Sequence, residues 1–247
     1  MTHIAATEIA TAALHLMRAG QWSTATNLLN AATTDDATER ATLALALAEV
    51  TVDQDFGRQT DHASAALTAA GALLDGSWDL ALLTLRKDYA TALFQAGESD
   101  LRTRALALIE EAPDDAHRGA AYFWAGTIAD NVYEQPTEAV DHYTAALELG
   151  EKTDDKLLIA QALRHLGYHA HAARDLALAR TQWERSAELL QEVGHLRPTL
   201  AQQTMLATLL RDEGDAEGSR ALATEINRWA RQLDVPFIIQ ETADLMA

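Results

Sequence analysis

The chain has 247 residues, no cysteine and a formal net charge of −18. The lack of cysteine excludes disulfides, thiolate metal sites and a cysteine nucleophile, and the acidic charge opposes binding to nucleic acids and to anionic membranes. Alanine and leucine supply 51 and 36 residues. Both lose little side-chain entropy in a helix, and runs of strand-forming residues are missing, so the composition predicts an all-α protein.

Turn signals divide the chain into predicted helical segments of about 12 to 20 residues. In chain order these signals are Ala19-Gly20, Asp55-Phe56-Gly57, Asp75-Gly76, Ala96-Gly97, Pro113-Asp114-Asp115, Pro136, Thr153-Asp154-Asp155, Asp175, Arg197-Pro198, Gly214-Asp215 and Val235-Pro236. All four prolines lie at these breaks, where the first turn of a helix tolerates proline. No stretch is rich in serine and glycine, so no interdomain linker is expected.

Three aspartate pairs precede alanine-rich helical segments: Asp35-Asp36, Asp114-Asp115 and Asp154-Asp155. An aspartate at this position accepts hydrogen bonds from the first N–H groups of a helix. We therefore expect N-caps rather than metal ligands, because no second acidic cluster accompanies the pairs. The last two pairs lie 40 residues apart, which indicates an internal repeat.

Two segments align at this spacing. The first carries Tyr122, Ala125, Gly126, Ala129, Ala139, Tyr143, Ala146 and Leu147, and the second carries Leu163, Leu166, Gly167, Ala170, Ala179, Trp183, Ser186 and Ala187. A third, weaker copy carries Leu206, Ala207, Leu210, Ser219, Ala223 and Ile226. Small residues let two helices approach closely, and an aromatic residue fills the gap to the next pair. Trp124 and Trp183 are accordingly expected in the core.

This pattern resembles the tetratricopeptide repeat, most clearly over residues 165–190 (HLGYHAHAARDLALARTQWERSAELL) and 122–149. The spacing departs from the family, since it is about 40 residues rather than about 34, and the terminal proline of each unit is absent. The resemblance implies a single domain over residues 1–247. Its fold would be a right-handed α-solenoid of about six antiparallel helix hairpins, closed by a short capping helix after Pro236.

The resemblance also implies a concave groove lined by the first helix of each hairpin. The residues carried to this groove are Lys87, Thr91, Phe94, Phe123, Thr127, Asp130, Asn131, Arg164, Tyr168, His171, Thr208 and Arg211. Arg164, Tyr168 and His171 are four and three residues apart, so they share one helix stripe. Cations in such a groove suit a carboxylate or a phosphate, and the aromatic rings beside them suit an extended peptide or an apolar ligand. The alternatives are ordinary solvated side chains and, for Phe94 and Phe123, core positions.

One histidine cluster comprises His165, His169 and His171. His165 and His169 stand four residues apart, a spacing that can present two imidazoles to a metal ion. No acid lies in the same helix turn to complete such a site, so a structural role is the favoured interpretation. His171 is expected to project in another direction.

The known catalytic and nucleotide-binding motifs are missing: there is no G-x-x-x-x-G-K-[ST], G-x-G-x-x-G, H-E-x-x-H or G-x-S-x-G. The sequence therefore predicts a non-enzymatic scaffold without cofactor or metal. Its partner would be a protein or peptide segment carrying an acidic group or a C-terminal carboxylate. The alternative is a small-molecule receptor, or an enzyme, that uses the same groove; DNA binding is disfavoured by the charge.

Location and assembly follow from weaker signals. The first 20 residues lack a basic segment ahead of an apolar run, and no apolar stretch is long enough to span a bilayer. We therefore expect a cytoplasmic protein without membrane contact. End-on packing of the terminal helix after Pro236 would give a homodimer.

Overall fold

The computed structural model of the protein describes residues 4–95 and 100–247, except the side chains of Phe94 and Gln95. Within these ranges the chain forms thirteen helices and no strand, which confirms the predicted all-α class. The described residues fall into two compact units, which divide between residues 99 and 100.

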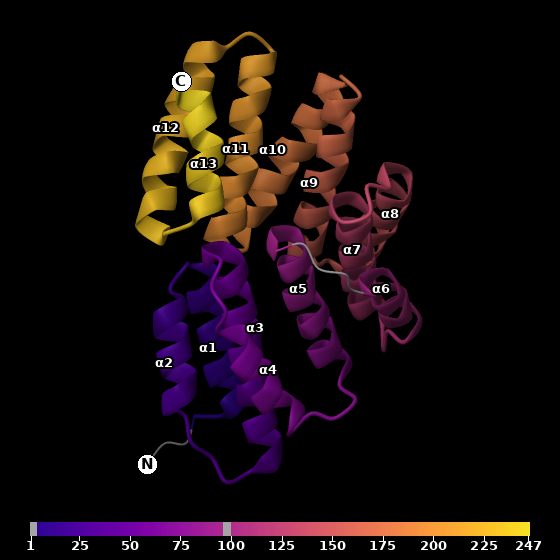
Figure 1. Ribbon diagram of the computed structural model, residues 1–247, viewed down its shortest axis with the longest axis vertical. Helices are drawn as coiled ribbons and strands as arrows, with labels where there is room; N and C mark the ends of the chain where they lie inside the picture. Colours follow the sequence, from indigo (N-terminus) through magenta and orange to yellow (C-terminus); the bar gives the residue numbers. More distant parts are fainter. Residues whose placement is uncertain (1–3, 96–99) are drawn as a thin grey trace. The chain divides into compact units, whose positions relative to one another are not determined.

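Five helices form the first unit (Figure 1): α1 (Ala6–Arg18), α2 (Trp22–Ala31), α3 (Ala37–Arg58), α4 (Ala63–Gly71) and α5 (Trp78–Gln95). The central element is α3, because it packs against each of the other four. Trp22 is 1% exposed, and its indole Nε1–H donates to the buried Asp53 carboxylate at 2.8 Å. This hydrogen bond fixes the start of α2 on α3.

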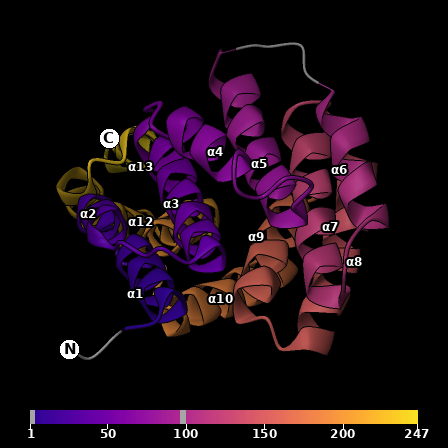
Figure 2. The ribbon, with the colours of Figure 1, turned by 90° about the horizontal axis from the view of Figure 1, so that it is seen from below.

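Eight helices form the second unit: α6 (Leu101–Glu110), α7 (Asp115–Asn131), α8 (Pro136–Thr153), α9 (Lys156–Ala172), α10 (Leu176–Glu192), α11 (Leu196–Asp212), α12 (Ala216–Leu233) and α13 (Pro236–Met246). From α6 to α13, each helix packs against the next in sequence. Further contacts join α7 to α9 and α11 to α13. Figure 1 shows α9, α10, α11 and α12 in chain order with α13 beside α11 and α12, and Figure 2 shows α6 beside α7.

The aspartate pairs begin helices, as predicted. The carboxylate of Asp36 accepts from the backbone N–H of Thr38 and of Glu39, both at 2.9 Å. Asp114 and Asp155 cap α7 and α9 in the same way. Each cap satisfies N–H groups that have no partner within the helix.

Glycines allow close contact between paired helices at two equivalent positions. A Cβ atom on Gly126 in α7 would lie 2.8 Å from the Tyr143 ring of α8. A Cβ atom on Gly167 in α9 would overlap the Trp183 ring of α10. Since both rings are almost fully buried, the repeated glycine and aromatic residue found in the sequence are one packing motif. Trp183 is therefore a core residue, as expected.

The terminal helix predicted after Pro236 is present as α13. It packs against α11 and α12 and buries Ile238, Thr242 and Leu245. Asn227 of α12 donates through Nδ2 to Thr242 Oγ1 at 2.8 Å. The helix thus covers apolar surface at the C-terminal end of the second unit.

One predicted break is wrong by a few residues. Asp55-Phe56-Gly57 lies inside the last turns of α3, which continues to Arg58. The Asp55 carboxylate reaches forward and accepts from the backbone N–H of His62 and of Ala63, both at 2.7 Å. Asp55 therefore caps the following helix from within the preceding one, which explains why a turn-forming residue stands in a helix.

The third predicted hairpin is divided, because α5 belongs to the first unit and α6 to the second. The turn predicted at Ala96-Gly97 lies outside the described residues. A single continuous solenoid and its right-handed sense therefore stay predictions.

Candidate functional site

Three predicted groove residues share one stripe of α9. This helix begins after the Asp155 cap and turns a set of small and apolar residues into the core: Leu158, Ala160, Ala162, Gly167 and Ala170. Arg164, Tyr168 and His171 occupy another stripe, and none of them is fully buried. Tyr168 is 48% exposed, so α9 presents an aromatic ring to solvent beside a cation and an imidazole.

Two predicted groove residues on different helices meet at one carboxylate. His171 Nε2 lies 3.0 Å from Asp212 Oδ2, and Arg211 Nε donates to Asp212 Oδ1 at 3.1 Å. Partial burial acts to raise the pKa of Asp212, but the hydrogen bonds from Arg211 and His171 hold it below its usual range. Asp212 therefore stays ionised and holds the two groups together at the ends of α9 and α11.

Asp130 on α7 contacts side chains of both α8 and α9, so it is not an open groove residue. Its Oδ2 atom lies 3.1 Å from His169 Nε2 on α9 and accepts from the Tyr143 hydroxyl on α8 at 3.4 Å. The Asp130 and His169 side chains are 12% and 16% exposed. Asp130 thus fixes the end of α7 against both neighbouring helices.

His165 packs against aromatic rings of the core. Its ring stacks on Tyr143 with centroids 4.6 Å apart and meets the edge of Phe123 at 5.6 Å. Burial, with smaller effects from the charges of Arg164 and His169, lowers the pKa of His165 to about 3. The imidazole is therefore neutral at physiological pH, in agreement with the structural role favoured from the sequence.

The predicted groove residues of α7 divide between core and surface. Phe123 and Thr127 are 6% and 5% exposed, and the Thr127 hydroxyl donates to the Phe123 carbonyl at 2.9 Å. Asn131 lies at the exposed end of the helix and donates to the Thr127 carbonyl at 3.1 Å. Phe123 accordingly occupies the core position that the sequence left open as the alternative.

The charge of Arg164 influences Glu241 on the terminal helix. Desolvation raises the pKa of Glu241 on α13, and the positive charge of Arg164 opposes that shift. A carboxylate from the last helix therefore lies within electrostatic range of the cation on α9. Thr208 on α11 donates its hydroxyl to the Thr204 carbonyl at 3.1 Å.

The other predicted groove residues lie on α5 in the first unit. Lys87 Nζ is 3.9 Å from Asp88 Oδ1, and the Thr91 hydroxyl donates to the Lys87 carbonyl at 3.2 Å. The side chain of Phe94 lies outside the described residues. The residues that the structure brings together are therefore those of the second unit.

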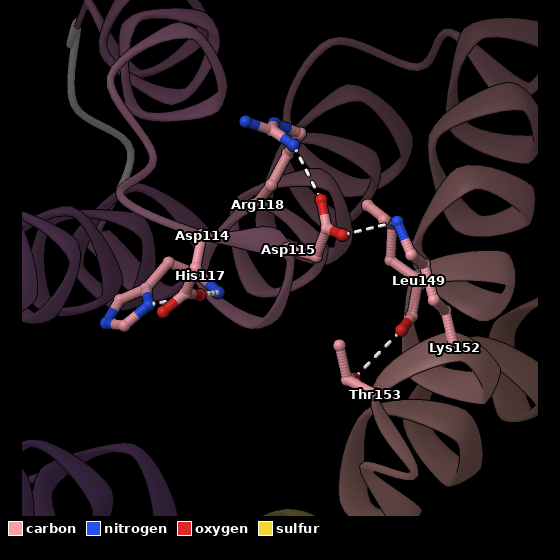
Figure 3. A network of polar contacts seen from close by, with 7 residues as sticks. All are labelled: Asp114, Asp115, His117, Arg118, Leu149, Lys152 and Thr153. Carbon is pink, nitrogen blue, oxygen red and sulfur yellow. Dashed lines mark hydrogen bonds and ion pairs between the residues drawn. The ribbon is translucent and has the colours of Figure 1, made fainter.

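A polar network closes the pairing of α7 with α8 (Figure 3). Asp115 at the start of α7 binds Arg118 at 2.8 Å and Lys152 near the end of α8 at 2.5 Å. Asp114 accepts from the backbone N–H of His117 at 2.9 Å and contacts its Nδ1 at 2.6 Å. The His117 hydrogen bonds lower the pKa of Asp114, and the Lys152 hydrogen bond lowers that of Asp115.

Asp212 and Glu241 were not predicted. Asp212 contacts Arg211 on its own helix and His171 on α9, and Glu241 on α13 lies within electrostatic range of Arg164. One signal could have found Asp212. It stands in the last turn of α11, where a carboxylate interacts unfavourably with the helix dipole. An acid in that position is expected to have a cation nearby that offsets this cost.

Within residues 4–95 and 100–247, no group of three or more histidine, aspartate or glutamate side chains is arranged to hold a metal ion. No helix in the same ranges is both long and apolar enough to cross a membrane. The chain matches no model of a known protein family, and the search of curated proteins gave no similar sequence. The repeat interpretation therefore depends on the residues and on helix packing.

Proposed function

We propose that the protein is a non-enzymatic scaffold of the helical-repeat type, which binds an extended peptide segment on its second unit. The proposed peptide surface comprises Arg164, Tyr168 and His171 on α9 with Thr208 and Arg211 on α11. In this proposal α7, α9 and α11 are the first helices of successive pairs, wound as a right-handed solenoid that α13 caps. The contact of His171 with Asp212 carries the proposal, because it brings the stripes of α9 and α11 to one place.

The chemistry of the peptide surface favours a partner with both an acidic and an apolar group. Arg164 and Arg211 can bind a carboxylate, and the exposed ring of Tyr168 offers area for an apolar side chain. Both cations already have acidic neighbours, Glu241 and Asp212. A carboxylate of the partner would compete with these neighbours, which favours a moderate affinity.

A peptide array tests the proposal. Wild type is compared with the double variant Arg164→Ala/Tyr168→Ala and with a matched control, Arg185→Ala/Leu178→Ala. The control removes one cation and one exposed apolar side chain from α10, outside the proposed peptide surface.

We expect acidic peptides to bind wild type and the control alike, and binding to the double variant to fall at least about tenfold. Equal capture by all three proteins would contradict the proposal. Melting-temperature increases with metabolites, together with no peptide binding, would instead assign these residues to a small-molecule receptor.

A further inference from the structure

The last three helices of the second unit bury more polar side chains than the helices before them. Ahead of residue 195, the buried serine, threonine, amide and imidazole side chains of this unit are Thr127 and Ser186. From residue 195 onward they are His195, Thr199, Gln202, Thr204, Ser219, Asn227 and Thr242. The α11–α13 segment, residues 195–247, therefore has a more polar core than α7 to α10 (Figure 1).

Some of these polar groups have partners within the segment, and others do not. The hydroxyls of Thr199 and Thr204 donate to carbonyls of α11 or its N-cap at 2.8 and 2.9 Å. Among the described residues, no hydrogen-bond partner reaches Gln202 Nε2 or Ser219 Oγ. The Gln202 and Ser219 residues are 0% and 1% exposed. A buried polar atom without a partner has lost its hydrogen bonds to water, so it destabilises the arrangement that buries it.

Gln202 lies where α11 meets α10. Ser186 Oγ on α10 is 3.2 Å from Gln202 Oε1 and 2.7 Å from the Ala160 carbonyl oxygen on α9. A serine hydroxyl has one proton, so it cannot donate to both oxygens at once. Turning the Gln202 amide over lets Nε2 donate to Ser186 but moves Oε1 to the position without a partner. The contact between α10 and α11 therefore contains a glutamine that is incompletely satisfied in either orientation.

The contact between α10 and α11 is also the least extensive of any consecutive helix pair in the second unit. Two further polar contacts reach the C-terminal end of α11: His171 of α9 contacts Asp212, and Arg180 of α10 binds Glu213. The Arg180 and Glu213 side chains are 36% and 29% exposed, and ion pairs this accessible to water add little stability. Within the segment, by contrast, α11, α12 and α13 all pack against one another.

We infer that the α11–α13 segment opens as one unit, by separating α11 from α10 while the helices before it stay packed together. Opening lets water reach the Gln202 amide, which offsets part of the contact that is lost. Segments of this kind open locally at a lower free energy than the whole molecule. Opening also separates the stripes of α9 and α11, so a peptide bound to both holds the segment closed. This last consequence rests on the proposed function.

Hydrogen exchange of backbone amides in the full chain, followed by mass spectrometry, tests the inference. Wild type is compared with Gln202→Met and with a matched control, Gln203→Met. Methionine is unbranched and flexible like glutamine but has no amide to satisfy. Gln203 is the next residue of the same helix and is only partly buried.

In wild type we expect the protected amides of α11, α12 and α13 to exchange together. Their exchange, corrected for intrinsic rates, should be at least about tenfold faster than that of α8, α9 and α10. Gln202→Met should slow exchange in the α11–α13 segment about threefold or more and leave α8 to α10 unchanged. Gln203→Met should change neither group.

Equal protection of the two groups of helices in wild type would overturn the inference, and this measurement does not require any variant to fold. Unchanged exchange in Gln202→Met would also overturn it, because simple fraying at the end of a helical stack does not depend on that side chain.

A parallel experiment adds the tightest-binding acidic peptide from the array to wild type. Slower exchange in the α11–α13 segment would support the coupling of opening to peptide binding. Unchanged exchange with the peptide bound would count against the proposed peptide surface alone, because the opening itself is measured without peptide.

Discussion

His165 illustrates how the core of the second unit controls the charge of one side chain. The ring lies among Phe123 and Tyr143, and burial lowers its pKa from 6.5 to about 3. In the unfolded chain the same group takes up a proton below about pH 6.5. Between these two pKa values the unfolded state binds one more proton than the folded state, so acidification favours unfolding.

Replacing this residue should weaken the acid sensitivity of the protein. We expect the unfolding free energy of wild type to fall, relative to His165→Phe, by about 1.4 kcal/mol for each pH unit below about 6.5. Phenylalanine keeps an aromatic ring against Tyr143 but cannot bind a proton. Urea unfolding of both proteins between about pH 7 and 5 measures the difference.

His15→Gln is the matched control, because His15 on α1 is exposed. This variant should retain the pH dependence of wild type. A His165→Phe variant with an unchanged pH dependence would show that His165 is protonated in the folded protein, contrary to the lowered pKa expected from its packing against Phe123 and Tyr143.

The sequence could assign local roles to residues but not their distant contacts. The caps at Asp36, Asp114 and Asp155 were predictable, because an N-cap bonds only its own helix. His165 and His169 could not be distinguished, since they are one turn apart on α9. What separates them is the partner: Tyr143 stacks on one, and Asp130 of α7 binds the other.

At the scale of helices, the packing of two pairs, α7 with α8 and α9 with α10, depends on a glycine facing an aromatic ring. A methyl group at Gly167 would overlap the Trp183 ring, which is 1% exposed and donates its Nε1–H to the Arg164 carbonyl at 2.9 Å. The hydrogen bond and the surrounding buried side chains hold the ring in place, so moving it would itself cost stability. Gly167→Ala should therefore lower the unfolding free energy by about 1 to 3 kcal/mol, measured by urea unfolding.

The control is Gly71→Ala at the end of α4, where the nearest atom to an added Cβ is Leu80 Cδ2 at 3.8 Å. Alanine there should be neutral or stabilise by up to about 1 kcal/mol, since a helix favours alanine over glycine. A Gly167→Ala protein as stable as wild type would refute the packing motif.

The repeat pattern was predictable because spacing along a helix determines which residues share its packing face. The end of α3 was not, since the Asp55 side chain caps the next helix from inside α3. Of the expected groove, Arg164, Tyr168 and His171 were selected by the family resemblance, and their spacing placed them on one stripe. The burial of Phe123 could not be decided in this way, because it depends on helices that approach α7 from elsewhere in the chain.

At the scale of the whole molecule, the net charge of −18 should dominate the response to salt. Many basic side chains already contact acids, including Lys152, Lys156 and Arg180. The excess negative charge remains, and its self-repulsion opposes the compact state.

Raising NaCl from about 20 to 300 mM shortens the Debye length from about 20 to 6 Å. The melting temperature near pH 7 should therefore rise. The control is the same titration near the sequence pI of about 4.7, where the repulsion is largely removed and the increase should vanish. A melting temperature that falls with salt at pH 7 would show that the ion pairs outweigh the repulsion.

Site-specific photo-crosslinking tests the proposed peptide surface most directly. A photoreactive phenylalanine replaces Tyr168 on α9 in one protein and Leu178 on α10 in another, two residues that are 48% and 46% exposed. Each protein is irradiated with the tightest-binding acidic peptide from the array. We expect crosslinks from position 168 and few from position 178. Crosslinks of equal yield at both positions, or from position 178 alone, would contradict binding on the stripe of Arg164, Tyr168 and His171.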